Sequence, residues 1–571
     1  MGPRAGLTRR GAGSDSLAVR AAVIGIVALA TCAGACAPAG VSRVRFANRD
    51  PVWRVNDRLD VERPARVGFP RLLYYFDQFA FRRLTRLMEV PEPRRAANVN
   101  SLDEVPDSTW FTNRIGIGAI TTDDLRRGPN TDDGPDRSGP WVIQGTKVGG
   151  VTVGFVIQDG RAHKYVLKFD RTGLPETETG ANVVVQRLMW ACGFQVPEDT
   201  IVRVTRDQLV LADDARVADT FGNQRRMTTA DLDQALARVN VQPDGSYRGM
   251  ASKFLTGETL GGVDPEGVRA DDPNDVVPHE ERRELRGQYA IFSWVDHTDV
   301  KWDNLLDVWS EDPVDPDVHY VVHYLIDFGN ALGTFGVVDH RDDDGFAHQI
   351  DFAVMLKSLF ALGLWRRPWE GARIPALTGV GRIEAERFDP GGWREEAPWT
   401  PFQRRDRHDG FWGAKLVAAF TPAMIRAAVD AGKYSDPRAA DYLWATLVAR
   451  RARVVKYWFD RVTPLERFAV EAGQLCFTDL AITYRLSRSA RPVYRLRAYG
   501  RDGGALGWEA IARPGPGGRA CAAGVPAGPG ADGYAIVKVE PSRAGASQRP
   551  VEAHLARNPA GLLRVIGIHR W

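Results

Sequence analysis

The sequence contains little cysteine, with five residues among 571. No two of them form a C-x-x-C pair, so a zinc-ribbon or dithiol redox site has no support. Cys192 falls in an apolar helical run, where we expect it to be buried as a small hydrophobe. Cys476 and Cys521 both lie in the C-terminal part, and export would allow a disulfide between them.

Several other signals are missing as well. The ten histidines include no H-E-x-x-H motif, which excludes the common zinc-protease signature. The net charge is only +3 and no Lys/Arg-rich run is present, so we expect no nucleic-acid partner. Beyond the N-terminus, no apolar run approaches transmembrane length. Hydrophobic residues make up 44% and charged residues 26%, as in globular proteins, and 571 residues suffice for two to four domains.

Residues 1–36 are predicted to be a targeting segment and not part of the fold. Several arginines precede an apolar run from Ala21 to Thr31 that is too short to span a membrane comfortably. The stretch Ala33-Gly-Ala-Cys36 resembles a bacterial lipobox and implies lipid attachment at Cys36, with Cys32 as the competing position. A plain secretory signal or an uncleaved anchor is the alternative. Ala37 resembles the second residue of lipoproteins that are not retained at an inner membrane, so we expect a lipid-anchored cell-envelope protein of the outer membrane or periplasm.

One polar motif lies in the middle of the chain. The stretch from His297 to Asn304 reads H-x-D-x-K-x-x-N, and Asp327-Phe-Gly329 follows it after two apolar segments. Phosphoryl transfer needs a carboxylate to orient the acceptor hydroxyl, a cation to offset phosphate charge and oxygen ligands for metal ions. Asp299, Lys301, and Asn304 with Asp327 are residues of these types.

These two stretches resemble the catalytic loop and the D-F-G metal motif of the protein-kinase-like fold. The resemblance implies that Asp299 takes the acceptor proton, that Lys301 meets the γ-phosphate of ATP, and that Asn304 and Asp327 hold Mg²⁺ or Mn²⁺. It also implies structural roles for His297, which would brace the loop, and for Gly329. The alternative is that Asp299 caps a turn and Asn304 satisfies a loop backbone. The predicted order of helix, loop, strand, turn, strand and metal motif favours the kinase interpretation.

The segment before this motif carries a second part of the resemblance. Short strands are predicted at 141–145, 151–158 and 163–169, with a turn at Gly149-Gly150 and a hairpin after the second strand. This order resembles a kinase N-lobe, and it implies that Gly149 and Gly150 approach the nucleotide phosphates while Lys168 binds them. An ordinary hairpin with a solvated lysine is the alternative.

A kinase-like lysine also needs an acidic partner on the following helix. Glu178 takes that role, as a further nucleotide-binding residue, if the helix that ends near Gly193 begins early enough. If the helix begins later, Asn182 occupies the expected acidic position and the ion pair is missing. The sequence leaves both possibilities open, and the second puts full catalytic activity in question.

Two features resemble atypical kinases, namely the HipA-like group and the secreted Golgi casein kinases. The predicted helix is followed by Gly193-Phe-Gln-Val-Pro197 and a strand, and no A-P-E motif follows Gly329. The resemblance implies an α+β fold with a two-lobed protein-kinase-like domain at 140–472. Its N-lobe would span 140–260 and its C-lobe 261–472.

Two regions flank this domain. Residues 37–139 form a predicted N-terminal extension, with one helix at 69–88 whose aromatic stripe is expected in the core, and a turn-rich stretch that wraps the next domain. Helices are predicted at 280–295, 350–364, 416–431 and 436–459, and irregular structure at 365–410. Residues 473–571 alternate strand-like runs with Gly/Pro-rich stretches and are predicted to form a small all-β domain, a sandwich.

The sequence therefore predicts an exported, lipid-anchored, kinase-like phosphotransferase that uses Mg-ATP on an unknown protein or envelope substrate. A pseudokinase acting as a binding or scaffolding module is one alternative, because the acidic partner is open and ATP should be scarce where a lipoprotein resides. Nucleotidyl transfer on the same fold is another, because both reactions use metal and nucleotide.

Overall fold

The computed structural model describes residues 40–68, 71–85, 94–147, 152–218, 224–335, 341–486, 492–543 and 546–571. The predicted positions Cys36, Gly149 and Gly150 lie outside the described residues. The chain divides into two compact units. The larger unit comprises Asp50–Pro464 and Leu480–Ser487, and the smaller one comprises Leu465–Asp479, Arg488–Trp571 and the chain up to Arg49.

The N-lobe of the larger unit is built on a seven-stranded sheet with the order β4-β7-β3-β2-β1-β5-β6. The strands are β1 (Trp141–Thr146), β2 (Gly154–Gln158), β3 (Lys164–Phe169), β4 (Asp199–Val204), β5 (Leu209–Ala218), β6 (Gln224–Arg226) and β7 (Tyr247–Lys253). Side chains alternate between buried and accessible along β1 and β3, and the buried ones form the lobe's core with helix α6 (Thr229–Leu236). This core holds β3, and therefore Lys168, in the middle of the sheet.

Helix α5 (Thr177–Cys192) begins early enough to include Glu178, which the sequence left open. It begins at Thr177, so Glu178 lies in its first turn and shares the helix with Asn182. It ends at Gly193, whose φ of 121° is rarely adopted by a residue with a side chain. Its apolar side chains belong to the same hydrophobic core as the helices of the C-lobe, which ties α5 to both lobes.

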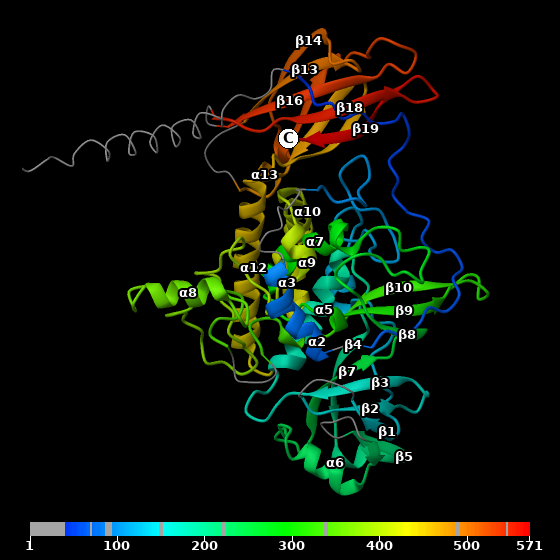
Figure 1. Ribbon diagram of the computed structural model, residues 1–571, viewed down its shortest axis with the longest axis vertical. Coiled ribbons are helices and arrows are strands. Elements are labelled where there is room, and N and C mark those ends of the chain that lie inside the picture. Colours follow the sequence, from blue (N-terminus) through cyan, green and yellow to red (C-terminus); the bar gives the residue numbers. More distant parts are fainter. Residues whose placement is uncertain are drawn as a thin grey trace, which may run out of the picture. The chain divides into compact units, whose positions relative to one another are not determined.

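The C-lobe joins a three-stranded antiparallel sheet to a group of helices (Figure 1). The sheet has the order β10-β9-β8, with β8 (Glu258–Gly262), β9 (Leu305–Glu311) and β10 (His319–Leu325). The helices are α7 (Arg283–Val295), α8 (Phe352–Phe360), α9 (Thr400–Arg404), α10 (Arg407–Ala419), α11 (Pro422–Ala431) and α12 (Pro437–Phe459). Residues 254–257 connect the two lobes between β7 and β8.

Helix α7 lies at the centre of this lobe and leads into the segment that contains the predicted catalytic motif. Every residue of α7 is buried, and the helix packs against α9, α10 and α12. Its buried Arg283 pairs with Asp103 at 3.0 Å and with Asp409 at 2.8 Å, which compensates the cost of placing a guanidinium inside the protein. The buried helix therefore holds the beginning of the segment between α7 and β9 in place.

Two helices differ from the sequence prediction. Residues 416–431 are not one helix, because Thr421 caps a new helix with Pro422 at its first position. The segment 71–85 consists of α2 (Arg71–Phe76), a π-helical turn (Asp77–Phe81) and α3 (Arg82–Thr85). The expectation of a buried aromatic stripe is wrong here, since Phe76 and Phe81 are 66% and 58% exposed. Helix α9 and the start of α10 also interrupt the predicted irregular stretch 365–410.

The N-terminal extension is divided between the two units, because residues 40–49 belong to the smaller unit and the chain from Asp50 onward packs on the larger one. Thr109 donates from its backbone N and its Oγ1 to the buried Asp57 carboxylate, which links two parts of the extension. Phe111 is fully buried against Phe194 and Trp412. The part from Asp50 onward thus contributes to the core of the larger unit.

The smaller unit is all-β, as predicted, but it begins at Leu465 and not at residue 473. One sheet contains β11 (Leu465–Glu471), β12 (Gln474–Asp479) and β15 (Arg519–Ala523). The other has the order β14-β13-β16-β18-β19, with β13 (Val493–Gly500), β14 (Ala505–Ala512), β16 (Ala535–Arg543), β18 (Val551–Arg557), β19 (Leu563–Arg570) and, beside β16, β17 (Ala546–Ser547). Phe477 of the first sheet packs edge-on against Tyr494 of the second, with ring centroids 5.0 Å apart.

The disulfide between Cys476 and Cys521 is present and joins β12 to β15 within the first of these sheets. Cys192 is a buried free thiol, as expected. Among the described residues, the helices include none that is long and apolar enough to cross a membrane.

Candidate active site between the two lobes

A cavity of about 450 Å³ opens between the N-lobe sheet and the catalytic motif. Strands of the N-lobe form one side, and the segments around β9 and β10 form the other. Its ionic and amide side chains are Lys147, Lys168, Asn182, Asp199, Lys253, Lys301, Asp303, Asn304 and Asp327. Four of the residues predicted from the sequence, from segments far apart in the chain, therefore line one cavity.

Lys168 and Asp327 are in direct contact. Lys168 Nζ lies 2.8 Å from Asp327 Oδ1, and the two side chains are 15% and 40% exposed. Burial lowers the pKa of Lys168, but the carboxylates of Asp327 and Glu178 outweigh it, and the net shift is upward. Burial likewise raises the pKa of Asp327, but Lys168 outweighs it and holds that pKa well below its usual range. Both groups are therefore charged at neutral pH.

The backbone around Asp327 is held in an unusual shape. Asp327 has a φ of 59°, in the left-handed region, and Phe328 is fully buried behind it. The Phe328 N–H donates to Asn182 Oδ1 at 2.8 Å, while Asn182 Nδ2 donates to Asp199 at 2.6 Å. Asn182 therefore joins helix α5, strand β4 and the D-F-G segment.

Gly329 makes room for Glu178. A Cβ atom at position 329 would lie 2.6 Å from the Glu178 Cγ, a distance that side chains do not tolerate. The early start of α5 therefore brings Glu178 against the D-F-G segment. The predicted structural importance of Gly329 has a physical basis here, namely the close approach of α5.

Glu178 does not pair directly with Lys168. Among the ion pairs of the described residues, Lys168 has Asp327 as its partner within 4.0 Å. Burial raises the pKa of Glu178 to about 7, against the opposing effect of Lys168, and the nearby Asp327 raises it further. Glu178 instead accepts a hydrogen bond from Thr152 Oγ1 at 3.4 Å, and Thr152 Oγ1 accepts one from Lys147 at 2.7 Å.

Lys147 is a second cation of the cleft, which the sequence interpretation did not single out. Burial lowers its pKa to about 8, and the positive charge of Lys168 lowers it further. It stands directly before the predicted glycine turn. A lysine beside glycines between two strands was the sequence signal that could have identified Lys147 as a residue of the site.

The predicted catalytic loop, residues 297–304, begins where α7 ends. Asp296 ends the helix with a φ of 55°, and its Oδ1 accepts hydrogen bonds from Trp393 at 2.8 Å and Arg450 at 3.3 Å. The Thr298 N–H donates to the Asn330 carbonyl at 3.3 Å. The loop is therefore fixed both to the helical core and to the segment after Gly329.

Asp299, Lys301 and Asn304 lie together within this loop. Lys301 Nζ donates to Asp299 Oδ2 at 2.7 Å, and Asn304 Nδ2 donates to the Asp299 carbonyl at 2.8 Å. Burial lowers the pKa of Lys301, but Asp299 and Asp303 outweigh it, so the net shift is upward. Asp299 itself faces a small pocket beside the main cleft, and Lys301 and Asn304 line both.

His297 lies beneath the loop. Its ring packs against Phe292 and Phe328, with centroids 4.7 Å and 5.5 Å away. Burial lowers its pKa to about 4, so the imidazole is neutral at physiological pH. The bracing role that the resemblance implied for His297 stays a prediction.

Two further acids next to the loop were missed in the sequence. Burial raises the pKa of Glu396 to about 8, and repulsion by Asp299 and Asp344 adds to the shift. Asp344 behaves similarly, and burial raises its pKa to about 7. The Glu396 backbone N–H donates to the Thr298 carbonyl at 2.9 Å, which fixes it beside the loop. No local sequence pattern identifies these residues. They lie near the loop only because the long segment after Gly329 folds back toward it.

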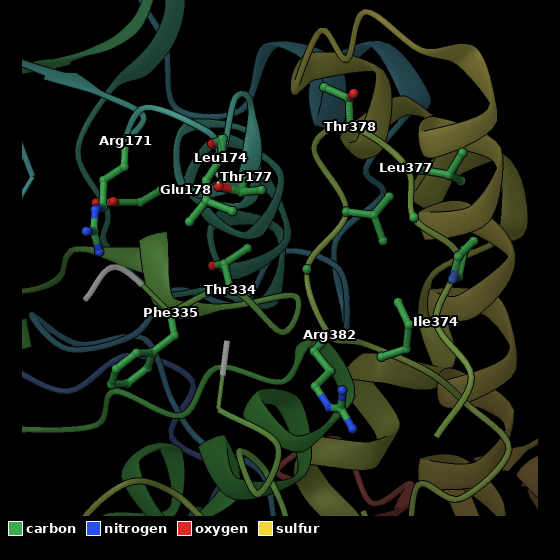
Figure 2. Close-up of a pocket in the computed structure, with 14 residues that line it drawn as sticks. Arg171, Leu174, Thr177, Glu178, Thr334, Phe335, Ile374, Leu377, Thr378 and Arg382 are labelled. Atoms are coloured by element: carbon green, nitrogen blue, oxygen red, sulfur yellow. Dashed lines mark hydrogen bonds between the residues drawn. The ribbon is translucent and has the colours of Figure 1, made fainter. Parts of the chain in front are cut away.

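A second pocket, of about 430 Å³, adjoins Glu178 (Figure 2). Its walls come from the start of α5, from Thr334 and Phe335 after the D-F-G segment, and from residues 374–382. Arg171 and Arg382 give it two guanidinium groups among apolar side chains. Glu178 lines this pocket and acts electrostatically on Lys168, so it stands between the pocket and the cleft.

Oxygen ligands for a divalent cation are present in the cleft. Asp327 and Asn304 offer the carboxylate and amide oxygens that Mg²⁺ and Mn²⁺ accept. Asn304 uses its Nδ2 to hold the loop, which leaves its Oδ1 for a ligand. Within the part of the chain that the structure describes, no three His, Cys, Asp or Glu side chains form a metal cluster. The residues therefore fit a metal that takes its remaining ligands from nucleotide phosphates and water.

No protein-family model matches the chain, and no curated protein matches it. Among solved structures, a Golgi casein kinase with Mn/ADP bound is 13% identical, covers 63% of this chain and 77% of its own, and has a TM-score of 0.27. A second Golgi casein kinase structure is 12% identical, covers 59% of this chain and 73% of its own, and has a TM-score of 0.27. A Rio2 kinase–ADP/Mg²⁺–phosphoaspartate complex from Chaetomium thermophilum is 14% identical, covers 43% of this chain and 62% of its own, and has a TM-score of 0.18. TM-scores this low carry no functional assignment, which has to come from the site itself.

Proposed function

We propose that this protein is a kinase-like phosphotransferase that binds Mg-ATP in the cleft between its lobes. The observation that carries the proposal is the meeting of distant segments at one cavity. Lys168 contacts Asp327 there, and Lys301 and Asn304 line the same space. The groups required for phosphoryl transfer are a phosphate-binding cation, metal ligands, a base and a second cation, and these residues with Asp299 supply all of them.

Each residue has one task in this proposal. Lys168 binds phosphate oxygens of ATP, and its contact with Asp327 orders both side chains beforehand. Asp299 orients the acceptor hydroxyl and takes its proton as the oxygen bonds to the γ-phosphorus and the bond to ADP breaks. Lys301, 2.7 Å from Asp299, offsets charge on the transferred group. A metal ion held by Asn304 and Asp327 would neutralise further phosphate charge.

The contact partner of Lys168 favours one alternative. Because Lys168 pairs with Asp327 and not with Glu178, the cleft also suits a pseudokinase that binds nucleotide or a partner without transfer. Nucleotidyl transfer is compatible with the same residues, since it uses the same cation and metal ligands.

The proposal extends to the location of the protein. Lipid attachment at Cys36 would hold the chain in the cell envelope, in the outer membrane or facing the periplasm. The disulfide between Cys476 and Cys521 supports this, because disulfides persist in oxidising compartments. The acceptor would then be a protein or another envelope component.

Label transfer tests the proposed activity. The purified protein is incubated with Mg²⁺ or Mn²⁺ and with ATP labelled at the γ or the α position, alone and with an envelope extract. We expect γ-label transfer that falls at least roughly 100-fold in Asp299→Asn, because a positioned base contributes that much. Transfer of α-label would redirect the assignment to nucleotidyl transfer, and absence of both labels from a folded protein would support the pseudokinase.

A matched pair of lysine variants separates the site from general charge effects. Lys168 and Lys164 lie on the same strand, but Lys164 is exposed whereas Lys168 contacts Asp327. We expect Lys168→Met to abolish Mg-ATP binding in calorimetry and Lys164→Met to leave it unchanged. Unchanged binding in Lys168→Met would contradict the proposed nucleotide site.

A further inference from the structure

Helix α8 is apolar and yet has no buried residue. Six of its nine residues are large apolar side chains, and only Lys357 carries a charge. The exposed apolar side chains in and around it are Phe352 at 50%, Met355 at 57%, Leu356 at 54%, Leu359 at 67%, Phe360 at 77%, Leu362 at 86% and Leu364 at 92%. Figure 1 shows α8 standing away from the other helices of the larger unit.

Such a cluster is unusual on a protein that is surrounded only by water. Full burial of a Leu, Phe or Met side chain stabilises by about 1.5–3 kcal/mol, so several of them left exposed indicate a partner that covers them. A partner protein typically covers one stripe of a helix. Here apolar side chains are exposed along the helix and also in the turn that follows it. This distribution fits a lipid medium that surrounds the segment better than a protein partner that covers one stripe.

The chain that follows the helix has the composition of a membrane interface. Trp365 follows the apolar turn and is partly exposed, whereas Trp369 is buried in the protein. Aromatic rings such as that of Trp365 prefer the headgroup level of a bilayer. Arg366, Arg367 and Arg373 are exposed within the same segment. Lys357 Nζ lies 4.2 Å from the centroid of the Trp365 ring, which places its charge at the same margin.

The charge of this segment favours anionic lipid. Between Asp351 and Arg373 the sequence has four basic side chains, Lys357, Arg366, Arg367 and Arg373, and two acidic ones, Asp351 and Glu370. Juxtamembrane basic residues attract anionic headgroups, whereas they oppose the association of two copies through the same surface. The apolar segment is short, with nine helical residues, against the roughly 20 that a transmembrane helix needs.

We propose that α8 and the turn through Trp365 insert into the headgroup region of an anionic phospholipid bilayer. The apolar side chains enter the acyl boundary, and Arg366 and Arg367 remain at the phosphates. The catalytic lobe thereby lies against the membrane surface by a contact that is separate from the predicted lipid anchor. The inference does not depend on the proposed phosphotransfer.

Another apolar stripe on the larger unit provides a comparison. Segment 71–85 exposes Leu73, Phe76, Phe81 and Leu84. Its Arg82, however, is engaged with Asp77 and Glu266. Arg82 is therefore less available to lipid headgroups than the exposed Arg366 and Arg373 near α8, although Arg367 is itself paired with Glu370 at 3.9 Å.

A site-specific probe tests the proposal on the full chain. Cys32 and Cys36 are replaced by serine, so that no lipid is attached and no other accessible thiol reacts, and Leu362→Cys is labelled with the polarity-sensitive dye NBD. We expect the fluorescence to rise several-fold and shift to the blue with phosphatidylcholine vesicles that contain phosphatidylglycerol, and to be quenched by spin-labelled lipid. Arg366→Gln with Arg367→Gln should weaken vesicle binding roughly 30-fold, from about 1 kcal/mol for each basic residue.

Val314→Cys provides the matched control, because Val314 is 90% exposed and apolar but lies in a turn between β9 and β10. Its label should remain in water throughout. An unchanged signal at position 362 with vesicles would overturn the proposal. So would a blue shift that appears without vesicles as protein concentration rises, which would identify a second copy as the occupant, or an equal response at both positions.

Discussion

At the residue scale, two carboxylates near one lysine behave in opposite ways. Asp327 contacts Lys168 directly, and its pKa lies well below the usual range. Glu178 is half-buried without such a contact, and loss of solvent raises its pKa to about 7. Environments that separate the pKa values of neighbouring acids are typical of functional sites. Binding of nucleotide phosphates would draw Lys168 away from Asp327 and leave that carboxylate available to a metal.

The buried Glu396 makes stability depend on pH. Its pKa rises from 4.5 to about 8, through burial and repulsion by Asp299 and Asp344, while Lys301 and Arg341 act in the opposite direction. Between these two values the native state holds a proton that the unfolded chain has released. The free energy of unfolding therefore falls as pH rises from about 5 to 8.

Glu396→Gln should reduce this dependence, because glutamine mimics the protonated acid. We expect the fall in melting temperature between pH 5.5 and pH 8 to be smaller in the variant by at least roughly 1 °C, the effect of about 1 kcal/mol in a unit as large as this one. Asp344 and Glu178 still titrate and leave a residual slope. Parallel melting curves for both proteins would contradict the assignment of the proton to Glu396.

At the scale of elements, helix α5 links the N-lobe to the D-F-G segment through Asn182. The side chain accepts from the Phe328 N–H at 2.8 Å and donates to Asp199 at 2.6 Å, and all three groups are buried. Removal of the amide leaves two buried polar groups without this partner, at a cost of about 1–3 kcal/mol each. Asn182 is therefore a positioning residue in our proposal.

Asn182→Ala should lower the melting temperature and weaken Mg-ATP binding together. Asn182→Asp alters only one of the two contacts, because a carboxylate still accepts from the Phe328 N–H but cannot donate to Asp199. We expect calorimetry to show weaker binding in both variants, with the larger loss of stability in Asn182→Asp, where two carboxylates face each other. Normal binding in Asn182→Ala would show that the D-F-G segment is held by other contacts.

The local elements around the site follow from short-range patterns. Strands before Lys168, helix α7 and the β9–β10 hairpin were predictable, because alternation, glycine turns and apolar periodicity specify them locally. The break at Thr421-Pro422 also has a local signal, a cap followed by proline, but the continuous apolar pattern concealed it. The start of α5 was not decidable, since Thr179-Gly180 disfavours a helix that tertiary packing nevertheless imposes.

At the scale of the whole molecule, long-range contacts could not be predicted from the sequence. Glu396 and Asp344 reach the catalytic loop only through a long return of the chain, and their residue types are common on surfaces. The exposure of α8 was also not predictable, because an apolar periodic run ordinarily indicates a core helix. Which apolar helices remain uncovered depends on the packing of the complete lobe.

The two compact units should respond separately to loss of the disulfide. Cys476 and Cys521 are separated by 45 residues, all within the smaller unit or the short excursion that it shares with the larger one. Restriction of a loop of this size in the unfolded chain stabilises by about 4 kcal/mol in the chain-entropy treatment. Cys476→Ser with Cys521→Ser should therefore lower one calorimetric transition by more than roughly 10 °C. The other transition and Mg-ATP binding should be unchanged.

Cys192→Ala provides the complementary control, because Cys192 is buried in the core of the larger unit. It should lower the transition that the disulfide variant leaves in place. If each variant lowers a different transition and leaves the other unchanged, each unit is stabilised by its own core. A single transition that moves in both variants would mean that the units unfold together. Residues 480–487, which return to the larger unit between two strands of the smaller one, would then be the segment that couples them.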